Sequence, residues 1–381
     1  GTDGKTIQHL EKLSEEKLVV LVQRKFSWYV PQSVRRVEIP KDNGKTRPLG
    51  IPTIMDRLVQ QCVLQVLEPI CEAKFHDHSY GFRPNRSQQH AISQVHKNMQ
   101  LSHLHYVVDI DIKGFFDNVS HGKLLKQLWT LGICDKKLIS IISAMLKAEV
   151  AGIGFPEKGT PQGGIVSPIL ANIYLDKFDK YIREYINRFD KGEIRKGNAQ
   201  YKLYEQRRYR LAKKLKNEKD EKVREQMAAE IKRLREERNK FPARNEMDSS
   251  IKRLKYVRYA DDFLIGVIGS LEDCKTVKED IKNYLKEALK LELSDEKTLI
   301  TNAQKPAKFL GFDIFIRRSN DLRKDINGKT IRSLGHVPVL YLNYETMRKK
   351  LFDYKAARIA VENGKEIWKS IVRTYMIDLD D

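Results

Sequence analysis

Two stretches of the chain alternate between apolar and polar residues, a pattern typical of β-strands that bury one face. The first runs from Tyr106 to Asp117 and contains Asp109 and Asp111, whose spacing places both carboxylates on one face of the strand. In the second, apolar runs lie on both sides of Tyr259-Ala260-Asp261-Asp262. This arrangement predicts two strands joined by a tight turn that contains two adjacent carboxylates.

Other segments follow helical periodicity or contain the residues of tight hairpin turns. Residues 56–73 form an apolar stripe at helical spacing. Residues 34–39 and 46–51 flank an Asn-Gly turn, and a second Asn-Gly at 327–328 predicts another hairpin. Residues 343–376 are expected to be helical. Together these segments predict an α+β fold.

The clustered carboxylates indicate the candidate chemistry. Ionised carboxylates are costly to bury without a partner, and a divalent cation is the usual remedy. Magnesium takes one or two carboxylates and leaves its other positions to phosphates and water. One acid of the 106–117 strand, with Asp261 and Asp262, therefore predicts two Mg²⁺ ions that support nucleotidyl transfer. Two alternatives stay open from the residues alone: a solvated hairpin tip, and Asp109 in place of Asp111 as the strand's ligand.

The charge of the chain indicates a polyanionic partner. The 381 residues include 71 Lys and Arg against 51 Asp and Glu, a formal net charge of +20, which favours nucleic acid. From Arg195 to Lys240 the chain has 17 basic and 8 acidic residues in long helix-forming runs. This segment is either a pair of solvated helices stabilised by ion pairs within each helix or an arm that binds RNA phosphates. The candidate RNA contacts in it are Arg207, Arg208, Arg210, Lys213 and Lys214.

The sequence contains no pattern typical of a membrane protein or of a disulfide-bonded one. No apolar run approaches the length that spans a bilayer, so no membrane partner is expected. The cysteines have no metal-binding spacing and are interpreted as reduced thiols, which predicts a cytoplasmic protein. The sequence leaves open whether the chain forms a homodimer.

Several short motifs occur in a fixed order along the chain. Taken in series, they resemble the reverse transcriptases encoded by group II introns, also called maturases, over about residues 1–335. The motifs are Gly1-Thr2-Asp3-Gly4, Val37-Glu38-Ile39-Pro40-Lys41, Thr46-Arg47-Pro48-Leu49-Gly50-Ile51-Pro52, Tyr80-Gly81-Phe82-Arg83-Pro84, the Asp111 strand, Gly159-Thr160-Pro161-Gln162-Gly163-Gly164, the Asp261 turn and Phe309-Leu310-Gly311-Phe312. Retron and diversity-generating reverse transcriptases share the Tyr-x-Asp-Asp turn and remain alternatives.

The resemblance implies a right-hand polymerase with fingers at 1–105 and a palm at 106–192 and 251–342. The palm is expected to be an antiparallel sheet backed by helices, with a primer-grip hairpin in its second part. Residues 193–250 are expected to form a basic helical insertion, and residues 343–381 the helical start of a thumb or a linker. Compared with the family, the chain is expected to lack the N-terminal leader and most of the thumb.

The same resemblance assigns the catalytic residues. Asp111, rather than Asp109, matches the family's strand ligand, and Asp261 and Asp262 match the acids of the turn. The backbone carbonyl of Ile112 is expected to complete the ligands of two Mg²⁺ ions. These residues are both the catalytic and the metal-binding prediction.

Further residues match the family's contacts with substrates. Those matched to the incoming deoxynucleotide are Lys41, Arg47, Ile112, Phe116, Gln162, Gly163 and Lys297, and those matched to the primer grip are Phe309, Leu310 and Gly311. Phe116 is expected to exclude a 2′-hydroxyl, and Lys297 to protonate the leaving pyrophosphate. Arg83 is predicted either to contact template phosphates or to anchor its loop against a palm carboxylate.

The implied function is RNA-directed DNA polymerisation with dNTP substrates, on an intron RNA template with a DNA or RNA primer. The family also implies a role in RNA splicing and retrohoming. A non-catalytic RNA-binding splicing cofactor is the alternative, because basic surfaces suffice for that role.

Overall fold

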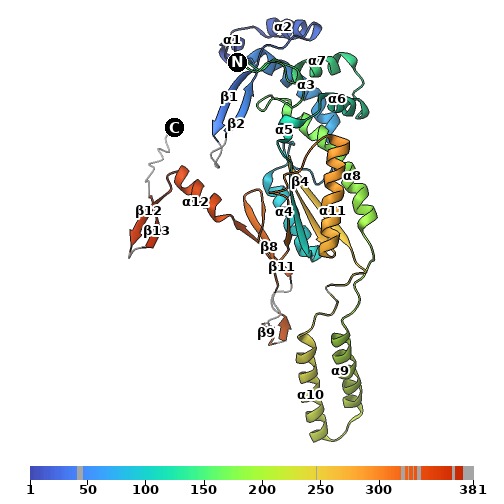
Figure 1. Ribbon diagram of the computed structural model, residues 1–381. Coiled ribbons are helices and arrows are strands. Elements are labelled where there is room, and N and C mark those ends of the chain that lie inside the picture. The colour runs from blue at the N-terminus through green and yellow to red at the C-terminus, as the bar shows by residue number, and fades with distance from the viewer. Residues whose placement is uncertain are drawn as a thin grey trace.

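A four-stranded antiparallel sheet lies at the centre of the chain (Figure 1). Its strands, in the order β4-β5-β3-β6, are β3 (Tyr106–Asp111), β4 (Arg253–Tyr259), β5 (Asp262–Ile268) and β6 (Leu299–Asn302). The computed structural model describes residues 1–40, 46–245, 247–318, 322–324, 326–328, 330–332, 336–362 and 365–371. The two alternating segments of the sequence are therefore strands of one sheet, as predicted.

Alternation along the strands divides the hydrophobic core between the two faces of the sheet. On one face, Val108 and Ile110 of β3 pack with Phe263 of β5 in the larger core. On the other face, Val107 of β3 and Leu264 of β5 belong to a smaller core. The acidic residues of β3 lie on this second face, because side chains two residues apart point the same way.

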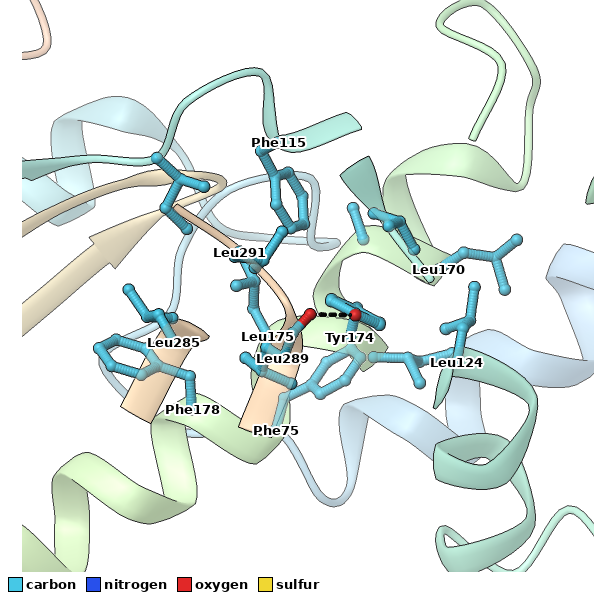
Figure 2. Packing of buried hydrophobic residues seen from close by; sticks show 14 of the residues in the cluster. Phe75, Phe115, Leu124, Leu170, Tyr174, Leu175, Phe178, Leu285, Leu289 and Leu291 are labelled. Carbon is cyan, nitrogen blue, oxygen red and sulfur yellow. Dashed lines mark hydrogen bonds between the residues drawn. The ribbon is translucent and has the colours of Figure 1, made fainter. Parts of the chain in front are cut away.

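Helices cover both faces of the sheet. The helices of the larger core are α3 (Ile54–Glu72), α6 (His121–Thr130), α7 (Lys136–Leu146), α8 (Ser167–Phe189) and α11 (Leu271–Tyr284), which continues as a π-helical turn (Leu285–Leu289). On the other face, α4 (Gln88–Ser102) packs against β4. Figure 2 shows Phe115, at the start of the short helix α5 (Phe115–Asn118), inserted into the larger core near Tyr174 and Leu291.

The N-terminal region contains the helices α1 (Ile7–Glu11) and α2 (Glu15–Ser27) and a hairpin of β1 (Arg35–Pro40) and β2 (Thr46–Ile51). The two strands pair antiparallel along their whole length. The hairpin prediction is therefore confirmed for its strands, while the turn at 41–45, including Lys41, lies outside the described residues. Helix α3 confirms the prediction of a helix at 56–73.

A second antiparallel sheet follows the central one. It contains β7 (Ala307–Phe309), β8 (Phe312–Arg318) and β11 (His336–Leu342), in the order β11-β8-β7. Between β8 and β11, the short strands β9 (Leu322–Lys324) and β10 (Thr330–Arg332) pair antiparallel. This pairing confirms the hairpin predicted from the second Asn-Gly sequence.

The basic segment forms an arm of two paired helices, α9 (Ala199–Asn217) and α10 (Glu221–Asn239). Figure 1 shows this arm extending away from the central sheet, on the side opposite to β1 and β2. Glu205 of α9 binds Arg208 of its own helix and Arg238 of α10, each at 2.6 Å. The ion pair with Arg238 joins the two helices, and the ring of Tyr204 stacks on Phe241, which lies just after α10.

The prediction of helix across 343–376 is wrong for much of its length. Helix α12 spans only Tyr344–Asp353, and two antiparallel strands follow, β12 (Ala357–Glu362) and β13 (Lys365–Ser370). The β-branched residues Ile359 and Val361 are two apart, which is the period of a strand and not of a helix, and β-branching also favours the strand. Both side chains are mainly exposed rather than buried. Residues 372–381 lie outside the described part of the chain.

The α+β prediction is confirmed, with antiparallel sheets backed by helices. Among the helices of the described residues, none is both long enough and apolar enough to cross a bilayer.

Candidate active site

Strand register places the acidic residues together at one end of the central sheet. Asp262, the first residue of β5, pairs with Asp111 at the end of β3 and with Tyr259 at the end of β4. Only Ala260 and Asp261 lie between β4 and β5, and Ala260 has a left-handed backbone with φ of 57°. The predicted tight turn is therefore present, and it meets the acidic end of the 106–111 strand.

A cleft of about 890 Å³ opens at this end of the sheet, and Asp111, Asp261 and Asp262 all line it. The other predicted site residues that line the cleft are Arg47, Ile112, Phe116, Gln162, Lys297 and Leu310. Thus residues from the β1–β2 hairpin, the palm sheet and the loop before α8 surround one space.

The carboxylates that line the cleft repel one another. Burial, with the nearby charges of Asp261 and then Asp111, raises the pKa of Asp262 to about 6. Burial also raises the pKa of Asp261, and the charge of Asp111 acts in the same direction. A bound cation would relieve both the repulsion and the cost of desolvation.

The donor set suits magnesium when a nucleotide is also present. Carboxylate oxygens are the hard ligands that Mg²⁺ prefers, and the ion usually combines one or two of them with substrate phosphates and water. Within the described part of the chain, no group of three or more Asp, Glu, His or Cys side chains forms a metal cluster by itself. The residues therefore fit a site completed by phosphates, while the two ions and the Ile112 carbonyl ligand stay predictions.

Asp109 lies further from the turn on the same face of β3, opposite Leu264 and Leu299. Burial raises its pKa to about 7, and the charges of Asp262 and Asp111 add to this effect. Asp109 lines a neighbouring cavity of about 280 Å³ together with Phe309, Leu310 and Gly311 of the predicted primer grip. Register thus favours Asp111 as the strand's contribution to the catalytic cleft.

Lys297 lies beside the acidic cluster. Its Nζ is 3.2 Å from Asp111 Oδ1, and the lysine side chain is 68% exposed. An ion pair this exposed contributes little stability, because water screens it. Lys297 can therefore leave Asp111 for a phosphate at low cost, although its role with pyrophosphate stays a prediction.

Phe116 and the loop before α8 form another wall of the cleft. The rings of Phe115 and Phe116 lie 5.2 Å apart, with Phe115 anchored in the core. The Gln162 carbonyl accepts a hydrogen bond of 2.7 Å from Gly50 N of β2. Gly163 has φ of 119°, and a Cβ there would lie 2.7 Å from Gly50 O. The loop and the β1–β2 hairpin therefore meet too closely for a side chain at 163.

Arg83 anchors its loop, but its carboxylate partner is Glu72 of α3 and not a residue of the predicted palm, and nothing in the structure supports its predicted contact with RNA. Its guanidinium forms a bidentate pair with Glu72, with distances of 2.9 to 3.0 Å. It also donates to the carbonyls of His76 and Ser79. The Arg83 side chain is 2% exposed. A buried guanidinium with all three nitrogens engaged has no free face for a phosphate.

Arg258 is a functional candidate that the sequence interpretation missed. It lies fully buried behind the acidic turn and forms a bidentate pair with Asp179 of α8, at 2.9 and 2.6 Å. It also donates to Asn172 Oδ1 and to the Ala260 carbonyl within the turn. The strand also contains Arg253 and Lys255, so no local pattern in the sequence distinguished Arg258 as a buried residue.

The candidate RNA contacts of the arm separate into two groups. Arg207, Arg210, Lys213 and Lys214 are exposed on α9. Arg208 is half-buried and bound to Glu205 of the same helix, so its guanidinium is already paired. The arm therefore presents fewer free cations than the sequence predicts.

Comparison with known proteins agrees with this geometry. The family model described as reverse transcriptase (RNA-dependent DNA polymerase) matches residues 39–204 and 233–314. The group II intron-encoded protein LtrA of Lactococcus lactis subsp. cremoris is 39% identical over 100% of this chain and 63% of its own length. Protein YkfC of Escherichia coli is 34% identical over 84% of this chain and 76% of its own.

A COX1/OXI3 intron 1 protein of Saccharomyces cerevisiae is 39% identical over 87% of this chain and 38% of its own length. The chain therefore spans less than two thirds of several of the relatives it matches. The alignments include the acidic strand, the turn and the cleft loops within the matched family ranges. The chain belongs to the reverse transcriptase (RNA-dependent DNA polymerase) family and is similar over its whole length to a group II intron-encoded member.

Proposed function

We propose that this chain catalyses RNA-directed DNA synthesis, adding deoxynucleotides to a primer 3′-hydroxyl. The single observation behind the proposal is the meeting of Asp111, Asp261 and Asp262 in one cleft with cationic and aromatic walls. Nucleotidyl transfer needs this arrangement, because negative charge develops on the phosphates while the 3′-oxygen attacks.

In the proposed reaction the primer 3′-oxygen forms a bond with the α-phosphorus, and the bond between the α-phosphorus and its bridging oxygen breaks to release pyrophosphate. Two Mg²⁺ ions, when bound, would activate the 3′-hydroxyl and stabilise the leaving group. Asp111, Asp261 and Asp262 would hold them. Arg47 lines the same cleft and would neutralise the triphosphate, while Lys297 would transfer a proton to the leaving oxygen.

The proposed template is intron RNA, with a DNA or RNA primer, and the proposed setting is the bacterial cytoplasm. These choices are supported by the full-length similarity to a group II intron-encoded protein of a bacterium. A role in splicing and retrohoming belongs to the same proposal.

Primer extension tests the proposal. Wild-type protein, Asp261→Asn and Asp262→Asn would be incubated with a DNA primer on an RNA template, Mg²⁺ and dNTPs. Each substitution is expected to lower the extension rate at least about a hundredfold, because a ligand charge is removed. Asp77→Asn, in an exposed loop, is the matched control and should extend normally. Equal extension by all four proteins would refute the assignment of the site.

A second function, RNA binding by the arm, is favoured by the uneven charge of its two helices. The basic residues of α9 are Lys202, Arg207, Arg208, Arg210, Lys213, Lys214 and Lys216, and its acidic residue is Glu205. By contrast, α10 has nearly as many acidic as basic residues. The surplus therefore lies on one helix, as expected for a surface that tracks a phosphate backbone.

Charge reversal tests the arm. Changing Arg207, Arg210, Lys213 and Lys214 to Glu should weaken RNA binding and reduce its salt dependence, by about 0.7 to 0.9 of log–log slope for each phosphate that is no longer neutralised. The matched control reverses four exposed cations of α10, which are Lys222, Arg224, Lys232 and Arg235. If both sets of substitutions weaken RNA binding equally, the loss comes from the overall charge of the protein, and the proposal that RNA binds α9 is refuted. Primer extension at saturating RNA should survive either change.

A further inference from the structure

Phe82 is an exposed aromatic residue in the wall of the catalytic cleft. It lines the cleft with half of its side chain exposed. Its backbone has φ of 54°, a left-handed conformation that is unfavourable for a bulky side chain. A strained backbone that presents an aromatic ring to a cleft is more readily explained by function than by folding.

The loop that contains Phe82 is held rigidly against the palm. Tyr80, two residues earlier, donates from its backbone N to the Arg258 carbonyl at 2.9 Å. Asn172 Nδ2 donates to the carbonyl of Gly81 at 2.8 Å. The buried Arg83 fixes the other side of the loop through its bidentate pair with Glu72.

The same loop contacts the catalytic turn. A Cβ at Gly81 would clash with the backbone nitrogen of Ala260, so the two backbones touch. Arg258, which binds the loop through its own carbonyl, also donates to the Ala260 carbonyl at 2.9 Å. The position of Phe82 is therefore fixed relative to the acidic turn, and the strain at Phe82 is maintained by its surroundings.

From this position the Phe82 ring meets Phe116. The two ring centroids lie 6.4 Å apart at an interplanar angle of 74°, an edge-to-face geometry within the favourable range for aromatic pairs. Phe116 also contacts Phe115, with ring centroids 5.2 Å apart. Phe115 is 2% exposed and anchored in the larger core. Phe116 thus contacts both a core ring and a ring of the cleft wall.

We propose that Phe82 is a specificity-determining residue that acts through Phe116, holding its ring where it excludes a 2′-hydroxyl. This inference rests on the proposed polymerase function and on Phe116 as the sugar gate. Steric exclusion requires that the excluding group does not yield when the larger substrate presses on it. Without Phe82, one side of Phe116 opens to the cleft, and the ring can turn away from a ribose.

The test is the ratio of kcat/KM for a dNTP to that for the matching rNTP, measured for wild type, F82L, F82A and F82Y. Removal of the edge-to-face ring pair is expected to lower this ratio about two- to tenfold in F82L and F82A. F82Y keeps the ring, and its ratio should stay within about twofold of wild type. Since half of the Phe82 side chain is exposed, the Tm of each variant should match wild type, which separates specificity from folding.

A double variant tests the route through Phe116. F116A should lower the ratio further than F82A, and adding F82A to F116A should change nothing more, because no gate remains to be held. Wild-type discrimination in F82A and F82L, or an additive loss in the double variant, would overturn the inference and leave the polymerase intact. A wild-type protein that extends no primer would instead refute the proposed function, and this inference with it.

Discussion

Asp109 offers a direct test of the electrostatics of the cleft, through stability rather than activity. Burial and two neighbouring carboxylates raise its pKa from an ordinary 3.8 to about 7. The folded protein therefore keeps a proton on Asp109 that the unfolded chain releases near pH 4. Between about pH 4 and pH 7 the folded state binds more protons than the unfolded state. The free energy of unfolding therefore falls as pH rises through that window, and the whole loss is present above it.

The magnitude follows from the difference between the two pKa values. Each pKa unit corresponds to about 1.4 kcal/mol, which gives an upper limit of about 4 kcal/mol at pH 8. Partial access to solvent reduces the expected effect to about 2 kcal/mol. Asp109→Asn is therefore expected to stabilise the protein by about 2 kcal/mol at pH 8, and by clearly less at pH 5.

The stabilities of wild type and Asp109→Asn are compared by urea unfolding at pH 5 and at pH 8. A chelator is present to remove divalent cations, and the salt concentration is fixed. Asp77→Asn, an exposed aspartate of a loop, is the control and should change stability by less than about 0.5 kcal/mol at either pH. Added Mg²⁺ should stabilise wild type more than Asp109→Asn, because a cation screens the same repulsion. The reasoning fails if Asp109→Asn destabilises at pH 8, or if its effect is the same at both pH values.

Three further predictions concern the support of the site. Asp179→Ala should destabilise the protein by about 3–5 kcal/mol in urea unfolding, because it leaves the buried Arg258 unpaired; a loss below about 1 kcal/mol would contradict this. Gly81→Ala should displace Ala260 and slow primer extension about tenfold or more while RNA affinity holds, and normal extension would show that the turn tolerates movement. Thr53→Ala should cost about 1 kcal/mol in thermal or urea unfolding, because Thr53 caps α3, and an unchanged midpoint would refute the cap.

Local patterns in the sequence were sufficient for the elements that form the site. Alternation predicted β3 and the β4–β5 turn, because a strand's two faces are encoded by neighbouring residues. The Asn-Gly sequences predicted hairpins for the same reason, since turn geometry depends on two residues. In the tail this rule was available and not applied: Asn363 and Gly364 stand between the paired residues Glu362 and Lys365. Helical spacing of apolar residues was given preference there, and the prediction was wrong.

Roles that depend on long-range partners were not accessible in this way. The two options for Arg83 differ only in whether Glu72 lies within reach, which the fold decides. Arg258 resembles a surface residue in the sequence, yet Asp179 from a distant helix neutralises it in the core. In the sequence, Phe82 is only one residue of a family motif. Its contact with Phe116 in the tertiary structure is what indicates a role for its ring.

The sequence by itself determined the strands, the acidic turn, the basic arm and the family, because each depends on residues close together in the chain or on motifs in series. The resemblance in sequence already favoured Asp111 over Asp109, and tertiary structure alone decided which arginines are free. It also decided that Asp262 and Asp109 have raised pKa values. The physical reason is that register, burial and ion pairing join groups far apart in sequence, and their energies depend on distances that a linear pattern does not contain.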